Sequence, residues 1–146
     1  MTLLRIFESP FGPISCYKSR ESLQNKLKSE PRSYDHQGQM YILHNHDCDF
    51  FAIDVEDFTQ PIPNIFNEVK KSHRLNEPID FYASWTVSEG ISKLTGVPIL
   101  VRLKEDGLKA TPLNKMFEIQ EKGFKFQGHS KVYYEEGMVI SVVSKI

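Results

Sequence analysis

Segment 50–58 constrains the fold most, because its residues fall into two alternating sets, one apolar and one that carries the acids Asp54 and Glu56. Successive side chains of a β-strand point to opposite faces, so a period of two predicts a half-buried strand. The apolar set is expected to face a core and the acids of the other set to face water. The first set is Phe51, Ile53 and Val55, and the second is Ala52, Asp54 and Glu56.

Further short runs with branched or aromatic residues predict more strands, separated by turn-forming residues. Runs 39–44 and 50–58 are expected to pair as a hairpin, with Asn45 to Asp49 near the turn. A second hairpin turn is expected at Lys104 to Gly107. Ser33 to Gln39 has the composition of a polar loop. The remaining expected strands are 2–7, 14–17, 79–83, 99–103, 117–120, 124–127, 131–134 and 138–144.

Three segments have helical signals. Segment 20–29 follows a possible N-cap, Ser19, and Pro31 stops it. Between 62 and 73, apolar residues recur at helical spacing as far as His73, which is expected to pack at the edge of the core. Thr86 to Glu89 matches a capping box and predicts a helix that ends at Gly96.

These elements predict an α+β fold, in which two or three helices pack on a mostly antiparallel sheet. With 146 residues, the whole chain (1–146) is expected to form a single domain. A chain of this length buries roughly 70% of its unfolded surface, so its core needs no metal or disulfide. Cys16 and Cys48 are expected to remain thiols, with Cys16 buried.

Charge is distributed unevenly along the chain. Segment 33–69 contains seven acidic residues and no Lys or Arg. The rest of the chain holds 12 acidic and 18 basic residues, a balance of +6, although the net charge is only −1. Such asymmetry bears on partners more than on fold. The two charges either neutralise each other across the folded surface or leave an acidic face for a basic partner.

The first hypothesis is a small protein-binding module or inhibitor that is not an enzyme and needs no cofactor. Its acidic face would attract a basic protein, and apolar residues would supply contact energy. Immunity proteins that inhibit basic nucleases use this physics, which is an analogy of charge alone. The expected acidic contacts are Asp47, Asp49, Asp54, Glu56 and Asp57, and the expected aromatic contacts are Tyr41, Phe50 and Phe58.

A metal-dependent hydrolase or nuclease is the second hypothesis. In an extended chain His44, His46 and Cys48 share one face and could bind one divalent ion. Imidazole and thiolate ligands suit zinc, whereas nearby carboxylates suit magnesium or manganese. The enzyme would use His44 and His46 together with Asp47 and Asp49, and Asp54 or Glu56 would assist. The intervening residues Asn45, Asp47 and Asp49 are turn formers, and a turn would separate the three ligands.

The third hypothesis is an enzyme that handles RNA or nucleotides, with His129 as a base near Ser130 in an expected loop. No glycine-rich phosphate loop or nucleic-acid motif accompanies them, so nucleic acid is not an expected partner. No segment approaches the ~20 apolar residues of a membrane span, and the N-terminal apolar run is too short for a signal peptide. We therefore expect a cytoplasmic protein without a membrane partner.

Overall fold

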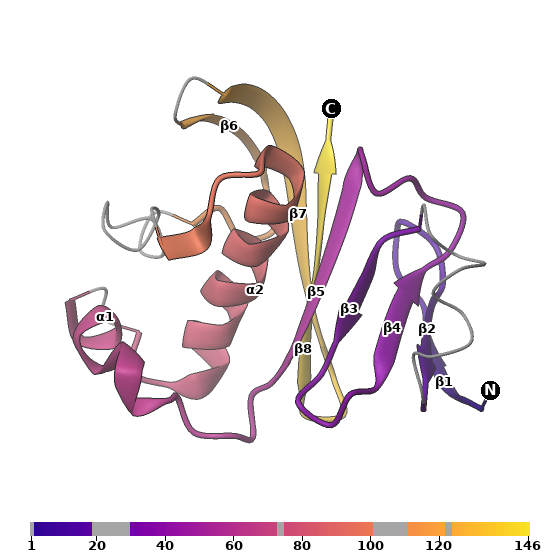
Figure 1. The fold of residues 1–146 in the computed structure, drawn as a ribbon, viewed down its shortest axis with the longest axis horizontal. Coiled ribbons are helices and arrows are strands. Elements are labelled where there is room, and N and C mark those ends of the chain that lie inside the picture. The colour runs from indigo at the N-terminus through magenta and orange to yellow at the C-terminus, as the bar shows by residue number, and fades with distance from the viewer. Residues whose placement is uncertain (1, 19–29, 73–74, 101–110, 122–123) are drawn as a thin grey trace.

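The computed structural model describes residues 2–18, 30–72, 75–100, 111–121 and 124–146. Figure 1 labels the elements in these ranges. The strands are β1 (Leu3–Phe7), β2 (Ile14–Tyr17), β3 (Arg32–Tyr34), β4 (Met40–Leu43), β5 (Phe51–Asp57), β6 (Met116–Glu121), β7 (Phe124–Glu135) and β8 (Met138–Lys145). A 3₁₀ helix, η1 (Asn64–Phe66), leads into α1 (Asn67–Ser72), and the long helix is α2 (Pro78–Thr95).

The described strands form two open, antiparallel, four-stranded sheets. The first has the order β1-β2-β4-β3 and the second the order β5-β8-β7-β6. The expected α+β class is confirmed, but the strands divide between two sheets. None of the helices in the described residues has the length and apolar character that a membrane span requires.

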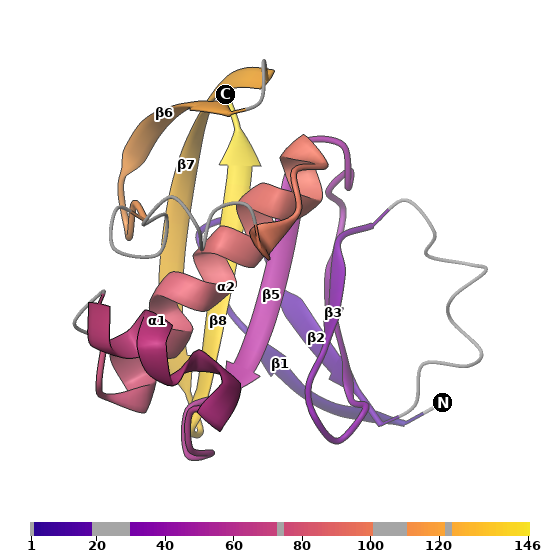
Figure 2. The ribbon, with the colours of Figure 1, turned by 60° about the vertical axis from the view of Figure 1, so that its left-hand side comes forward.

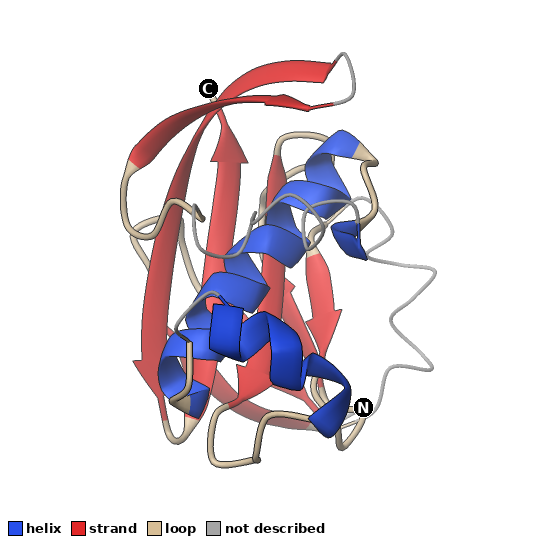
Figure 3. Cartoon of the chain, turned by 90° about the vertical axis from the view of Figure 1, so that its left-hand side faces the viewer, coloured by secondary structure: helices blue, strands red, loops and turns tan. Residues whose placement is uncertain are grey.

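The elements are stacked in three layers, which Figure 1 shows edge-on, with the helices at the left and strands β1 to β4 at the right. Figure 2 turns the molecule so that α2 comes forward over the second sheet, and Figure 3 shows α2 crossing that sheet's face. The second sheet is therefore the middle layer.

Strands β5 and β8 are buried on both faces, because each contributes side chains to two cores. Ile53 and Val142 lie in the core between the two sheets, where both are 0% exposed. Ala52 and Val143 point to the opposite face and pack against α2. The alternation in segment 50–58 therefore separates two cores, whereas the sequence predicted one core and water.

Several sequence predictions are confirmed. Strands expected at 2–7, 14–17, 39–44, 50–58 and 138–144 correspond to β1, β2, β4, β5 and β8. The strand expected at 117–120 is β6, while the two expected at 124–127 and 131–134 are one continuous strand, β7. The α2 helix ends where Gly96 adopts a left-handed φ of 74°, as expected.

The predicted hairpin between 39–44 and 50–58 is wrong. β4 pairs with β2 and β3, whereas β5 pairs with β8. Residues between Leu43 and Phe51 carry the chain from one sheet to the other. A strand buried on both faces has apolar partners from distant parts of the sequence, and local pattern does not reveal which strand they belong to.

The strand predicted at 79–83 and the helix start predicted at Thr86 are also wrong. α2 begins at Pro78, where proline is well suited to the first helical turn. Thr86 lies inside the helix, and its hydroxyl contacts the carbonyl oxygens of Tyr82 and Ala83. The same hydroxyl makes a buried hydrogen bond with Ser141 Oγ on β8 at 2.6 Å, and this bond joins α2 to the second sheet.

The remaining predictions were partly right or concern residues that the structure does not describe. The expected loop 33–39 overlaps the short strand β3. Segment 62–73 is helical only from Asn64, and Ile65 is 84% exposed, so the expected apolar stripe is interrupted. The helix expected at 20–29, the packing of His73 and the turn expected at 104–107 lie outside the described residues, as does most of the strand expected at 99–103.

Candidate functional site

Asp54 corrects the expectation that the acids of segment 50–58 face water. Its side chain points from β5 toward α2 and is 8% exposed. Oδ1 accepts hydrogen bonds from Ser33 Oγ and Lys93 Nζ, each at 3.2 Å. Burial raises the pKa of this carboxyl, and the charge of Lys93 opposes that rise. Asp54 is therefore a buried network residue and is not available to a partner's surface.

Glu56, two residues further along β5, is half-buried. Burial, followed by the negative charges of Asp54, Glu89 and Asp57, raises the pKa of this carboxyl to about 7, and the charge of Lys93 opposes the rise. None of the described residues donates a hydrogen bond to it. A carboxyl group in this state exchanges its proton near neutral pH and gains from the approach of a cation.

An open cavity of 410 Å³ lies beside Glu56. Asp57 and His36 contribute further polar atoms, and Pro61, Pro63 and Tyr82 provide apolar and aromatic surface. His36 Nδ1 lies 3.9 Å from Asp57 Oδ2. Burial opposes ionisation of Asp57, but hydrogen bonds from the hydroxyl and backbone N–H of Thr59 outweigh it and lower the pKa. The cavity thus combines the Asp57 carboxyl, whose pKa is lowered, with the Glu56 carboxyl, which titrates near pH 7.

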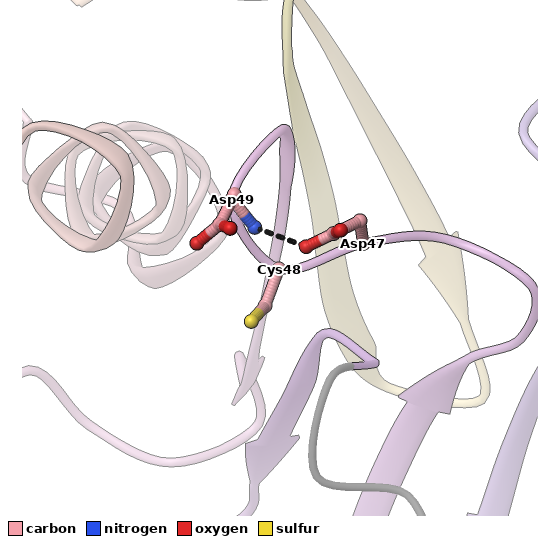
Figure 4. A group of neighbouring side chains, drawn as sticks. All are labelled: Asp47, Cys48 and Asp49. Atoms are coloured by element: carbon pink, nitrogen blue, oxygen red, sulfur yellow. Dashed lines mark hydrogen bonds between the residues drawn. The ribbon is translucent and has the colours of Figure 1, made fainter.

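The other end of β5 begins after a turn that holds Asp47, Cys48 and Asp49, all exposed. Figure 4 shows the three side chains together, with Asp47 Oδ1 accepting a hydrogen bond from the Asp49 N–H at 2.9 Å. Each of these three described residues offers one atom that could bind a metal ion, and the three atoms lie within 4.8 Å of one another. The hydrogen bond is that of an Asx turn, which accounts for Asp47 without a metal. Phe50 follows and is 56% exposed.

His44 and His46 have separate partners. The His44 ring contacts Ser15 Oγ at 2.8 Å through Nε2 and lies 3.5 Å from Glu30 through Nδ1. The His46 ring contacts the carbonyl oxygen of Phe11 and packs edge-on against Phe51, with ring centroids 4.3 Å apart. The turn thus separates the expected ligand trio, and the three side chains of His44, His46 and Cys48 do not converge.

Tyr41 and Phe58 also differ from expectation. Tyr41 is 0% exposed and belongs to the core between the sheets, so it offers no surface to a partner. Its hydroxyl donates to Asp35 Oδ2 and accepts from Arg5, both at 3.2 Å. Phe58 is half-buried and packs edge-on against Tyr134. Of the three expected aromatic contacts, Phe50 is therefore the one that is exposed.

The loop expected around His129 is part of β7. His129 and Ser130 are neighbours on this strand, so their side chains point to opposite faces. Ser130 is 0% exposed, and its hydroxyl donates to the carbonyl oxygen of Pro112 at 2.5 Å. The pair cannot act together as base and nucleophile, because the strand separates them.

Sequence reasoning missed the residues that α2 and β3 bring to β5. Lys93, Glu89 and Tyr82 come from α2, and Ser33 comes from β3. None of the four lies next to β5 in the sequence, and the one that belongs to a motif, Glu89, matches a helix cap and not a functional site. A weak signal existed in Lys93, a charged residue in the last turn of a helix that is otherwise heavily buried.

No known protein family matches the chain, and no curated protein is similar enough to count as a relative.

Proposed function

We propose that the protein is a small binding module that docks a basic partner protein through an acidic edge. This edge consists of Asp47, Asp49 and Phe50 before β5, and Glu56, Asp57 and Phe58 at its end. The observation that carries the proposal is the environment of Glu56. Its carboxyl lacks a hydrogen-bond donor among the described residues, stands among three other acids and borders an open cavity.

A lysine or arginine side chain from the partner fits this cavity chemically. Its methylene stem would pack on Pro61, Pro63 and Tyr82, while its charge would meet Glu56 and Asp57. A guanidinium also suits an aromatic wall, because it can stack on the ring face. The cation would replace repulsion among the carboxylates with attraction and would favour the ionised form of Glu56.

The two ends of the acidic edge are separated by the length of β5. Six residue steps of an extended strand cover about 20 Å. A partner that engages both ends would span a distance typical of a protein interface rather than of a small ligand. Phe50, exposed beside Asp49, would supply apolar contact at the end remote from the cavity.

Inhibition of a basic nuclease is the role that this charge pattern favours, by analogy with immunity proteins. Long-range attraction raises association rates, and salt screens it over about 10 Å at 0.1 M. The described cysteines, Cys16 and Cys48, are both free thiols, so a reducing compartment such as the cytoplasm is the proposed location.

The proposal is tested by capturing partners from a lysate of the source cells at low salt, identifying them and measuring their association rates with the purified module. We expect a basic protein whose association slows at least tenfold between 0.05 and 0.5 M salt, estimates typical of steered encounters. Asp49→Lys combined with Glu56→Lys should remove most of that attraction.

Glu118→Lys is the matched control, because Glu118 is an exposed acid on β6, away from the acidic edge. This variant changes the net charge by the same amount as either Asp49→Lys or Glu56→Lys alone. It should leave the association rate nearly unchanged. Equal slowing by Glu118→Lys and by Glu56→Lys alone would contradict a specific acidic edge. A captured partner that is acidic, or indifferent to salt, would contradict the proposed function itself.

A further inference from the structure

Ser15, His44 and Glu30 form an arrangement that the acidic edge does not use. His44 Nε2 lies 2.8 Å from Ser15 Oγ, and His44 Nδ1 lies 3.5 Å from Glu30 Oε2. The imidazole therefore stands between a hydroxyl and a carboxylate, one on each ring nitrogen. This is the order of groups that activates a serine nucleophile in acyl-transfer enzymes of unrelated folds.

The two sheet strands and the turn that follows β4 hold this arrangement in place. Ser15 on β2 pairs with Ile42 on β4, and His44 is the first residue after β4. The His44 N–H donates to the carbonyl oxygen of Pro13 at 3.3 Å, which fixes the start of the turn beside β2. Both reacting groups thus sit on one strand pair of the first sheet.

Glu30 is held by the same turn. Asn45 has a φ of 65°, a left-handed conformation, and its N–H donates to Glu30 Oε2 at 2.8 Å. The same oxygen faces His44 Nδ1. A carboxylate in this place favours the tautomer with the proton on Nδ1, which leaves the Nε2 lone pair for the Ser15 hydroxyl.

We propose that Ser15, His44 and Glu30 are a serine esterase centre that acts on short-chain carboxylic esters. Ser15 would be the nucleophile and His44 the general base, both catalytic residues, while Glu30 would position His44. The proposal does not depend on the acidic edge or on a protein partner.

The reaction balances with water as the only second reactant. Ser15 Oγ forms a bond to the ester carbonyl carbon as its proton passes to His44 Nε2. The carbon–oxygen bond of the ester then breaks, and the alcohol leaves with the proton from His44. Water, deprotonated by His44, attacks the acyl-serine and releases the carboxylic acid while the proton returns to Ser15 Oγ.

The size of the substrate follows from burial. Ser15 is 5% exposed, whereas the side chains of His44 and Glu30 are 24% and 17% exposed. A bulky acyl group cannot reach a hydroxyl so deeply placed, whereas acetyl, with two carbon atoms, is among the smallest acyl groups. Acetyl esters are thus the expected substrates, and long-chain esters should react far more slowly.

The decisive experiment treats the folded wild-type protein with a small alkyl fluorophosphonate and locates the adduct by peptide mass spectrometry. The expected result is one adduct, on Ser15, that is lost in His44→Gln. Ser144→Ala is the matched control: Ser144 is a buried strand serine, 6% exposed, whose hydroxyl contacts a backbone oxygen of His129 at 3.5 Å and no imidazole. This variant should be labelled like wild type.

A second measurement follows hydrolysis of p-nitrophenyl acetate. Ser15→Ala and His44→Gln should each lower the rate by at least about 100-fold, the usual contribution of a nucleophile or general base. His129→Gln controls for the background reaction of an imidazole outside this arrangement, because His129 lies half-buried on β7, and it should leave the rate unchanged. Absence of a Ser15 adduct on folded wild type, or an adduct that persists in His44→Gln, would overturn the proposal.

Discussion

Lys93 Nζ on α2 lies 3.2 Å from Asp54 Oδ1 on β5 and donates a 2.7 Å hydrogen bond to the carbonyl oxygen of Ile53. Ser33 on β3 contacts the same Asp54 oxygen, and its hydroxyl accepts the Val55 N–H at 3.2 Å. The side chains of Lys93 and Ser33 thus form hydrogen bonds with backbone groups at the outer edge of β5. They also join the three layers at one point, and they blunt an edge that could otherwise pair with another chain.

Removing the Lys93 charge should destabilise the fold. Lys93→Met leaves Asp54 buried without its cation, and truncation of one partner of a buried pair costs several kcal/mol. Lys93 is 39% exposed, so solvent screens part of the loss and we expect about 1–3 kcal/mol. Urea unfolding followed by circular dichroism measures this change.

The surface pair of Lys125 and Glu118 is the matched control for Lys93. Their side chains are 62% and 52% exposed, and the Nζ–Oε1 distance is 3.4 Å. Lys125→Met should change the free energy of unfolding by less than about 0.5 kcal/mol. In the double variant Lys93→Met with Asp54→Asn, the loss should be smaller than the sum of the two single losses. Full additivity would refute the coupling.

Glu56 should make stability fall as pH rises. Its folded pKa of about 7 lies above the ordinary value of 4.5, so the native state binds more protons than the unfolded state between these two values. The free energy of unfolding therefore decreases from about pH 4.5 to 7. Glu56→Gln removes this term and should stabilise the protein at pH 8 by on the order of 2 kcal/mol.

Urea titrations of wild type and Glu56→Gln from pH 5 to 8 measure the difference in slope. Some slope should survive, because the pKa values of Asp54 and Glu89 are raised as well, chiefly by burial. Glu118→Gln is the control, since Glu118 is exposed and its pKa is lowered by Gln127 and Lys125. If Glu56→Gln kept the wild-type slope, the assignment of the titration to Glu56 would be wrong.

Elements with a local signal could be predicted from the sequence. The alternation in 50–58 located β5, and Gly96 marked the end of α2, because period and left-handed turns depend on residues close in sequence. The partner of β5 could not be predicted this way. Its register joins Phe51 to Ser144 and Asp57 to Met138, which are 93 and 81 residues apart in the sequence.

The start of α2 shows how a local signal can mislead. The capping-box pattern of Thr86 and Glu89 is compatible with a helix start, yet Phe81 and Tyr82 pack in the same core as Val87 and extend the helix toward Pro78. Burial of these aromatic side chains decided where the helix begins, and the capping-box pattern did not. Glu89 instead joins the acids near Glu56, a role that only the packed fold gives it.

The candidate site was predicted in part, for the same reason. The acidic segment could be identified from composition, and Asp47 and Asp49 are indeed exposed. The burial of Asp54 could not, because it depends on a helix that covers the second face of β5. The contact between Ser15 and His44 likewise depends on the pairing of β2 with β4.

Gly90 should tolerate no side chain, although it lies inside a helix. A Cβ atom added there would lie 2.7 Å from Val143 Cγ2, closer than packed carbon atoms approach. Alanine would improve helix propensity by about 1 kcal/mol, but the clash should outweigh this gain and give a net loss of about 1–3 kcal/mol. Thermal and urea unfolding of Gly90→Ala measure the net effect.

The Val143→Ala background tests the cause of that loss. Removing the Cγ atoms of Val143 relieves the 2.7 Å contact but leaves its Cβ atom 3.3 Å from the new methyl group, so Gly90→Ala should cost clearly less there. Such a recovery would identify the contact between α2 and β8 as the reason for glycine. If Gly90→Ala stabilised the protein when Val143 is present, close packing at this position would be disproved.

The two cysteines should differ sharply in reactivity. Cys48 is exposed, whereas Cys16 is buried, and burial raises the pKa of the Cys16 thiol. Thiolate is the reactive form, so Cys16 is both inaccessible and mostly protonated. With dithionitrobenzoate the native protein should release one equivalent quickly, from Cys48, and a second only in denaturant. Cys48→Ser should abolish the fast phase, and a fast phase that survives in this variant would show that the core between the two sheets opens readily around Cys16.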